Sequence, residues 1–273
     1  ESLARTTEVQ YGTIQALATV TEARDPYTAG HQRRVTQLAC AVARELGLPA
    51  DRVAGLRVMG LLQDLRKISI PAEILSKSGK LSDMEFGIIK SHAQAGYEIV
   101  KEIRFPWPVA EAVLQHHERM DGSGYPKGLA GADIPVFGRI AGLVDCFDAM
   151  TTKRPYAPAK SAYDAVRDLN SLSGTGFQRE LVEQFVQAVG MFPTGSLVEL
   201  NTNEVALVIE QNRVQRLRPK LMLLLNADKT PVSRHELLDL KAKPAGGDDD
   251  EARWILRGLE PGAFGLDPKD YFG

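Results

Sequence analysis

Hydrophobic residues recur every three to four positions through the first two-thirds of the chain. One such stripe ends at Gly47 and consists of Val35, Leu38, Ala39, Val42 and Leu46. This spacing places side chains on one face of a helix, so it predicts amphipathic helices. The same pattern recurs in residues 53–63, 88–99, 109–116, 140–147, 161–170 and 178–190. Residues 1–192 are therefore predicted to form one helical domain.

The pattern changes after Pro193. Three short segments are rich in Val and Leu and are separated by polar turns: residues 195–200, 205–210 and 220–225. Such runs predict β-strands. Residues 245–251 combine Gly-Gly with three aspartates, which is typical of a loop. We therefore expect residues 193–273 to form a small β-rich C-terminal extension.

Composition narrows the class of protein further. The chain has 273 residues, 44% hydrophobic and 25% charged, and a net charge of −2, so no overall basic field favours DNA as a partner. Cys40 and Cys146 form no CxxC motif, which favours a reducing, cytoplasmic setting. Apolar runs such as Leu221–Leu225 are too short to span a bilayer, so no membrane segment is expected.

The segment His116–Pro126 carries the strongest chemical signal. Two adjacent imidazoles, His116 and His117, precede an acid and a Gly-Ser-Gly turn. Imidazole holds transition metals near neutral pH, and glycine lets a backbone come close to a ligand. The segment therefore predicts a metal site beside a substrate loop.

Further polar groups lie on or next to the predicted apolar helix faces. One of them alone would be read as a hydrogen-bonded core residue or a helix cap. A buried carboxylate is costly without a cation or strong donors, and helical bundles build metal sites from inward-facing imidazoles and carboxylates. Six such groups on five segments favour a metal site: His31, Asp64, His92, His116, His117 and Asp145.

Residues 20–190 resemble an HD-GYP domain, the subgroup of the HD phosphohydrolase superfamily that hydrolyses cyclic di-GMP. The matching segments are Asp25–His31, Gln63–Pro71, Ile74–Lys77, Ser91–Gly96, His116–Pro126, Asp145–Thr151 and Arg154–Tyr156. The part after Pro193 resembles the small extension that follows some of these domains. The expected fold class is therefore mainly α, an HD-type helical bundle with a small β-rich C-terminal extension.

The resemblance also implies a cofactor and roles for single residues. It implies two divalent metal ions, iron or manganese, held by the six groups above with Asp64 as the bridging ligand. It implies that Lys67, Tyr125 and Arg154 contact or orient the substrate, and that Asp64 and Lys67 serve catalysis. Asp148, one helical turn after Asp145, is either a further catalytic group or a hydrogen-bond partner within its helix.

The chain departs from the family pattern at several positions. Gln63 replaces the histidine of the His-Asp pair, and a neutral amide oxygen is a weaker ligand than imidazole, so the metal site is expected to be under-occupied. Arg66 replaces a glycine, and Ala157 stands where a lysine is frequent. The Arg66 guanidinium is either a surface group or a replacement for that missing cation in substrate binding. Tyr27 replaces a glutamate of some members, which favours two metals at most.

These observations leave two classes of function open. The first is a metal-dependent phosphodiesterase that hydrolyses cyclic di-GMP, with activity reduced by Gln63. The alternative is a catalytically inactive cyclic di-GMP receptor or protein-interaction module, for example one that binds a diguanylate cyclase or another signalling protein. We also expect a homodimer formed through the first helix, residues 2–24.

Overall fold

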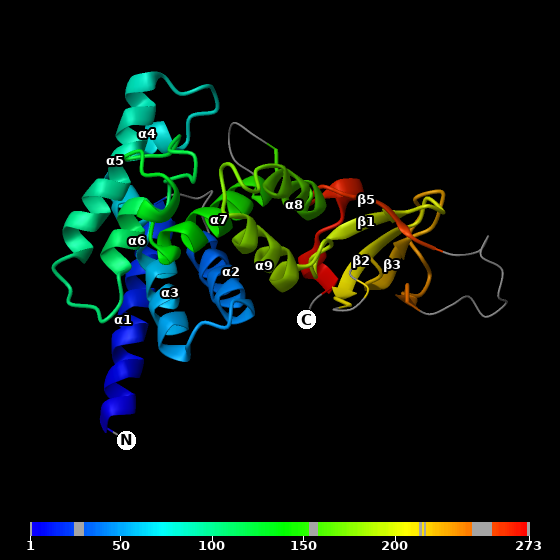
Figure 1. Ribbon diagram of the computed structural model, residues 1–273. Coiled ribbons are helices and arrows are strands. Elements are labelled where there is room, and N and C mark those ends of the chain that lie inside the picture. The colour runs from blue at the N-terminus through cyan, green and yellow to red at the C-terminus, as the bar shows by residue number, and fades with distance from the viewer. Residues whose placement is uncertain are drawn as a thin grey trace. The chain divides into compact units, whose positions relative to one another are not determined.

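The computed structural model describes residues 2–24, 30–152, 158–212, 215, 217–241 and 253–271. The chain divides into two compact units, Glu1–Pro158 with Leu169–Ala188 and Ala159–Asp168 with Val189–Gly273. The predicted fold class is confirmed, because the first unit is helical and the second contains a small antiparallel sheet (Figure 1). The domain boundary expected after residue 192 stays a prediction, and the loop expected at residues 245–251 lies outside the described residues.

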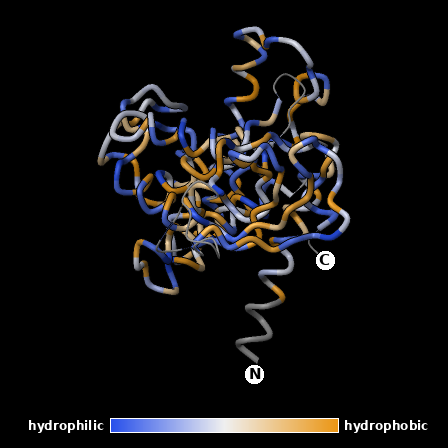
Figure 2. Tube along the Cα trace, turned by 90° about the vertical axis from the view of Figure 1, so that its right-hand side faces the viewer, coloured by the Kyte–Doolittle hydropathy of each residue, from blue (hydrophilic) through white to orange (hydrophobic). Residues whose placement is uncertain are grey.

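The longer helices, apart from the first, follow the predicted hydrophobic stripes. They are α1 (Ser2–Arg24), α2 (His31–Glu45), α3 (Ala50–Leu62), α5 (Asp83–Val100), α6 (Val109–Gln115), α7 (Val136–Thr151), α8 (Ala162–Ser171) and α9 (Arg179–Val189). Short elements that the pattern did not predict are α4 (Ala72–Leu75) and the 3-10 helices η1 (Leu65–Ser69) and η2 (Gly131–Asp133). Hydrophobic and hydrophilic residues alternate along the tube in Figure 2, as expected for amphipathic elements. Within the described residues, no helix combines the length and apolar character needed to cross a bilayer.

Two glycines bring the central helices of the first unit close together. A Cβ on Gly60 of α3 would lie 2.9 Å from the Thr36 Cα of α2. A Cβ on Gly142 of α7 would lie 2.7 Å from the carbonyl oxygen of His116. Because real Cβ atoms do not approach other atoms so closely, both contacts require glycine. The packing of α2 on α3 and of α6 on α7 positions the polar groups described below.

The second unit contains a five-stranded antiparallel sheet in the order β4-β3-β2-β1-β5. Its strands are β1 (Leu197–Leu200), β2 (Val205–Glu210), β3 (Lys220–Leu225), β4 (Leu237–Asp239) and β5 (Ile255–Gly258). Both faces of the sheet carry apolar clusters, one around Val198 and Leu221 and the other around Leu197 and Leu224. This explains why the central strands are continuous hydrophobic runs rather than alternating ones. The sequence did not predict β4 and β5, which are short edge strands.

Candidate metal centre

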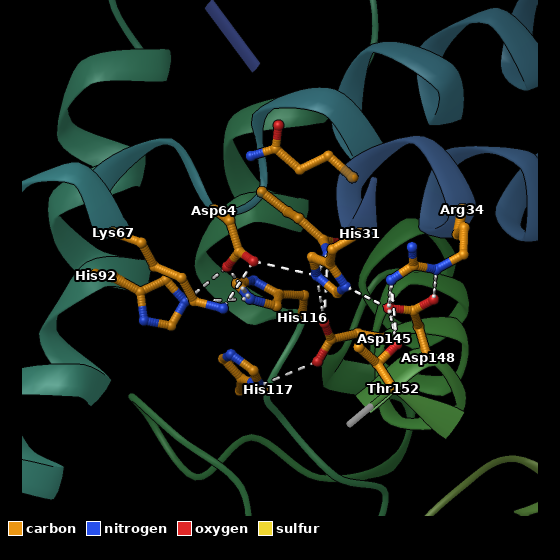
Figure 3. Close-up of polar contacts among 12 residues, drawn as sticks. His31, Arg34, Asp64, Lys67, His92, His116, His117, Asp145, Asp148 and Thr152 are labelled. Carbon is orange, nitrogen blue, oxygen red and sulfur yellow. Dashed lines mark hydrogen bonds and ion pairs between the residues drawn. The ribbon is translucent and has the colours of Figure 1, made fainter. Parts of the chain in front are cut away.

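The six predicted ligand residues converge inside the helical unit (Figure 3). They form two groups, one of His92, His116 and His117, and one of His31, Asp64 and Asp145. Within each group, the nitrogen and oxygen atoms that face one another lie within 4.8 Å. The residues come from α2, the turn after α3, α5, the end of α6 and α7, so the contacts exist only after these elements pack.

The imidazole group is arranged to present bare nitrogen atoms. His92 Nδ1 donates to the carbonyl oxygen of Ile89 over 2.6 Å, and His116 Nδ1 donates to that of Val113 over 2.7 Å. A carbonyl only accepts, so the proton is on Nδ1 and the Nε2 atoms, 3.3 Å apart, are free to bind a cation. Burial lowers the pKa of His92 to about 4 and lowers the pKa values of His116 and His117 as well. All three rings are therefore neutral near pH 7, the form that ligates metals.

The second group surrounds His31 with carboxylates. His31 Nε2 lies 3.2 Å from both Asp64 Oδ2 and Asp145 Oδ1, and His31 Nδ1 lies 2.7 Å from Asp148 Oδ2. Burial lowers the pKa of His31, but hydrogen bonds to the three carboxylates outweigh it and raise the pKa well above its usual value. A proton between Asp64 and Asp145 thus supplies the positive charge that these buried anions need.

Asp64 connects the two groups. Its Oδ2 accepts from Lys67 Nζ over 2.7 Å, while its Oδ1 lies 3.5 Å from His92 Nε2 and 4.0 Å from His116 Nε2. Burial raises the pKa of Asp64, yet Lys67 and His31 hold it well below its usual value. Oδ1 is buried and has no hydrogen-bond partner within the part of the chain that the structure describes. A buried anionic oxygen without a donor is costly, and this donor set of imidazoles and carboxylates fits divalent transition metals.

Gln63 lies in the carboxylate group. It caps the end of α3, is fully buried, and places Nε2 3.4 Å from both His31 Nε2 and Asp145 Oδ1. Its Oε1 is buried without a hydrogen-bond partner among the described residues. The departure from the family's His-Asp pair therefore affects the group of His31, Asp64 and Asp145, and the three imidazoles of the other group are intact.

Asp148 is fixed by residues that the sequence analysis missed. Arg34 donates from Nε to Asp148 Oδ1 over 2.5 Å and from Nη2 to Oδ2 over 3.0 Å, and Thr152 donates to Oδ2 over 3.3 Å (Figure 3). Because Asp148 in turn faces His31 Nδ1, this contact orients the imidazole toward the centre. The sequence spacing could have indicated this role of Arg34, because Arg34 follows His31 by three positions on α2 and lies on the same helix face.

The loop after His117 packs on the imidazole group. The Tyr125 ring stacks on His117, with ring centroids 4.6 Å apart and planes inclined by 28°. Glu118, also missed by the sequence analysis, is buried and accepts backbone hydrogen bonds from Lys127 and Leu129 over 2.8 and 2.9 Å. A Cβ on Gly124 would lie 2.5 Å from the His117 carbonyl oxygen, so only glycine allows this close return of the loop. The peptide bond from Tyr125 to Pro126 is cis.

Two predicted substrate residues remain without a defined role. Arg66 lies in η1 with its Nε buried and, among the described residues, without a hydrogen-bond partner. Arg154 and Ala157 lie outside the described residues, as does Tyr27. The hypothesis that Arg66 replaces a missing cation therefore stays a prediction.

Imidazoles and carboxylates gathered inside a helical bundle define a class of metal-binding helical proteins. Within that class, the chain belongs to the HD domain family, which matches residues 15–181, and the expected HD-GYP membership is confirmed. Phosphohydrolases of this family are metal-dependent. A second family, described as "KOW domain associated with HD domain", matches residues 197–245, which belong to the second unit.

Several characterised proteins are similar to this chain. A protein named cyclic di-GMP phosphodiesterase from Pseudomonas aeruginosa is 37% identical over 218 residues, 79% of this chain and 52% of that protein. One of the same name from Thermotoga maritima is 40% identical over 64% of this chain and 48% of its own length. A 3'3'-cGAMP-specific phosphodiesterase from Vibrio cholerae is 33% identical over 66% of this chain and 39% of its own length.

The fold has a counterpart among solved structures. The crystal structure of a cyclic GMP-AMP specific phosphodiesterase from Vibrio cholerae matches with a TM-score of 0.51 at 20% identity, covering 65% of this chain and 48% of that one. This likeness supports the fold. The chain spans about half the length of the first curated relatives it matches.

Proposed function

We propose that the chain is a metal-dependent phosphodiesterase that hydrolyses cyclic di-GMP. The observation that carries the proposal is Asp64, which presents one oxygen to each of two ligand groups and keeps Lys67 beside it. Relatives with 37% and 40% identity that are named cyclic di-GMP phosphodiesterases support the same substrate.

The proposed cofactor is a pair of divalent ions, iron or manganese. His92, His116 and His117 would hold one ion, and His31 and Asp145 the other, with Asp64 as a ligand of both. Such ions lower the pKa of water to near neutrality and neutralise charge on phosphoryl oxygens.

Side chains next to the proposed metal ligands would bind the substrate or orient the ligands. Lys67 Nζ lies 2.7 Å from Asp64 Oδ2, which keeps Asp64 ionised, and Lys67 would donate to a phosphate oxygen of the substrate. Tyr125 lies over His117, where it would orient the substrate, and Arg154 and Arg66 are proposed as further substrate contacts. Asp148 would act by orienting His31, a positioning role rather than proton transfer.

A receptor without turnover is the second candidate, because Gln63 places an amide donor on Asp145 where the family has an imidazole ligand. Metal analysis of the purified protein and an assay with cyclic di-GMP and added Mn²⁺ or Fe²⁺ separate the two. Bound metal with linear dinucleotide or GMP as product supports the enzyme. Tight binding of cyclic di-GMP without any product, at full metal loading, would contradict it.

Three further points belong to the proposal and rest on the sequence. They are a cytoplasmic location, a homodimer formed through α1, and contact with a diguanylate cyclase or another signalling protein. Size-exclusion chromatography with light scattering tests the second, and a dimer that survives charged substitutions on exposed Leu17 and Val20 would contradict the use of α1.

A further inference from the structure

A hollow of about 490 Å³ lies at the start of α5 and in the loop before it. It is lined by Ser78, Gly79, Lys80, Leu81, Asp83 and Phe86. This volume lies in the range of pockets that hold small ligands. None of these residues is among the six proposed metal ligands, so the hollow is separate from the metal centre.

A series of ring contacts joins the hollow to the metal centre. The Phe86 and Tyr125 rings meet edge to face, with centroids 6.2 Å apart, and Tyr125 stacks on His117 at 4.6 Å. Lys90 Nζ lies 4.8 Å from the Phe86 ring centroid and 5.8 Å from that of Tyr125. Two ring-to-ring steps therefore separate the hollow from the imidazole group, a span that one nucleotide can bridge.

Asp83, Phe86 and Lys90 occupy positions i, i+3 and i+7 of α5, so they share one helix face. A capping box fixes the start of this helix, because the side chain of Ser82 accepts from the Glu85 N–H and the side chain of Glu85 accepts from the Ser82 N–H. Phe86 is nevertheless 44% exposed. An aromatic ring held at the edge of a hollow and left open to water offers a stacking surface for a flat ligand.

We propose that this hollow binds a guanine base of the cyclic dinucleotide and so sets the base specificity of the site. The inference rests on the proposed function. Phe86 stacks on the base, and the carboxylate of Asp83, which only accepts hydrogen bonds, receives the N1–H and N2–H of guanine. Adenine presents an unprotonated N1 at that edge, which a carboxylate repels. Lys80 and Lys90 supply positive charge beside the anionic backbone of the ligand.

The test compares Phe86→Ala, Asp83→Asn and the control Met84→Ala, which removes a more exposed apolar side chain of the same helix that does not line the hollow. For each we would measure KM with Mn²⁺, and the Kd of the chelated protein by calorimetry, for cyclic di-GMP and cyclic di-AMP. Phe86→Ala should raise both constants for cyclic di-GMP at least about fivefold, the lower range for losing one stacked base. Phe86→Trp should retain binding.

Asp83→Asn should weaken cyclic di-GMP and strengthen cyclic di-AMP, because an amide pairs with the donor and acceptor of adenine. Met84→Ala should change neither constant. If the unmodified protein binds or hydrolyses cyclic di-GMP while Phe86→Ala and Asp83→Asn behave like it, the hollow is not the base site and the proposed function stands. If the unmodified protein neither binds nor hydrolyses any cyclic dinucleotide, the proposed function fails and this inference fails with it.

Discussion

Gln63 Nε2 donates a hydrogen bond to Asp145 Oδ1 over 3.4 Å, although the two residues are 82 positions apart in the chain. Through this contact the Gln63 amide donates to the Asp145 oxygen that would otherwise face a cation. The contact affects the carboxylate group, while His92 and His116 keep bare Nε2 atoms and His117 Nε2 is buried without a hydrogen-bond partner among the described residues. The two proposed metal positions should therefore differ in affinity, with the imidazole group the stronger one.

Replacing Gln63 by histidine should add the missing imidazole ligand. Gln63→His is expected to raise the metal content from about one toward about two ions per chain and to increase turnover of cyclic di-GMP. Metal analysis after gel filtration and a competitive metal titration measure the change. Gln63→Leu is the control, since it keeps a buried side chain of similar volume but offers no ligand. Equal metal content in both variants would contradict the assignment of Gln63 to a metal position.

The pH dependence of the stability of the metal-free protein should reflect the titration of His31. Burial lowers its pKa, but Asp145, Asp148 and Asp64 raise it well above 6.5, so the protonated form stabilises the folded state. That stabilisation is complete below the unfolded pKa of about 6.5 and is lost as pH rises through the folded value. Thermal unfolding of the chelated protein should show Tm falling above about pH 7.

The other three imidazoles do not confuse this measurement. Burial lowers their pKa values, so they change the stability only at pH values below about 6.5. There they make the stability rise with pH, which is opposite to the effect of His31. Added Mn²⁺ should abolish the fall in Tm at alkaline pH, because a cation replaces the proton between Asp64 and Asp145. A Tm that stays level from about pH 7 to about pH 9 without metal would rule out a protonated His31.

Arg34 should influence metal binding without touching the metal. Arg34→Ala removes the donors that fix Asp148, whose carboxylate orients His31, so metal affinity should fall about tenfold. Arg33→Ala is the matched control, because the neighbouring Arg33 carries the same charge and is exposed. Competitive titration with a metal-binding dye measures both. An equal loss in the two variants would point to an effect of net charge.

Gly124 should be essential for the loop that carries Tyr125. In Gly124→Ala the new Cβ would meet backbone atoms, 2.5 Å from Arg119 N and from the His117 carbonyl oxygen. Because backbone cannot move aside cheaply, we expect about 1–3 kcal/mol of lost stability together with a lower kcat/KM. Gly87→Ala in α5 meets nothing within 4 Å and should be nearly neutral. Urea denaturation and the cyclic di-GMP assay give the two readouts, and a stable, active Gly124→Ala variant would contradict the close packing of the loop.

The sequence by itself determined the local elements and the chemistry they carry. Helical spacing located α2, α3, α5 and α7, and Val- and Leu-rich runs located β2 and β3 within a residue or two. Imidazoles and carboxylates on apolar faces pointed to a metal site because a buried charge needs a partner. These inferences hold because side-chain periodicity and burial cost are properties of single elements.

Only the tertiary structure decided which groups meet. It divided the six residues into two groups, showed Asp64 facing both, and placed Gln63 with the carboxylates. It also brought Arg34 to Asp148, and it paired the short edge strands β4 and β5, whose sequences carry weak signals. Distances between residues 30 to 120 positions apart depend on how helices pack at glycines such as Gly60 and Gly142, and no local pattern encodes that packing.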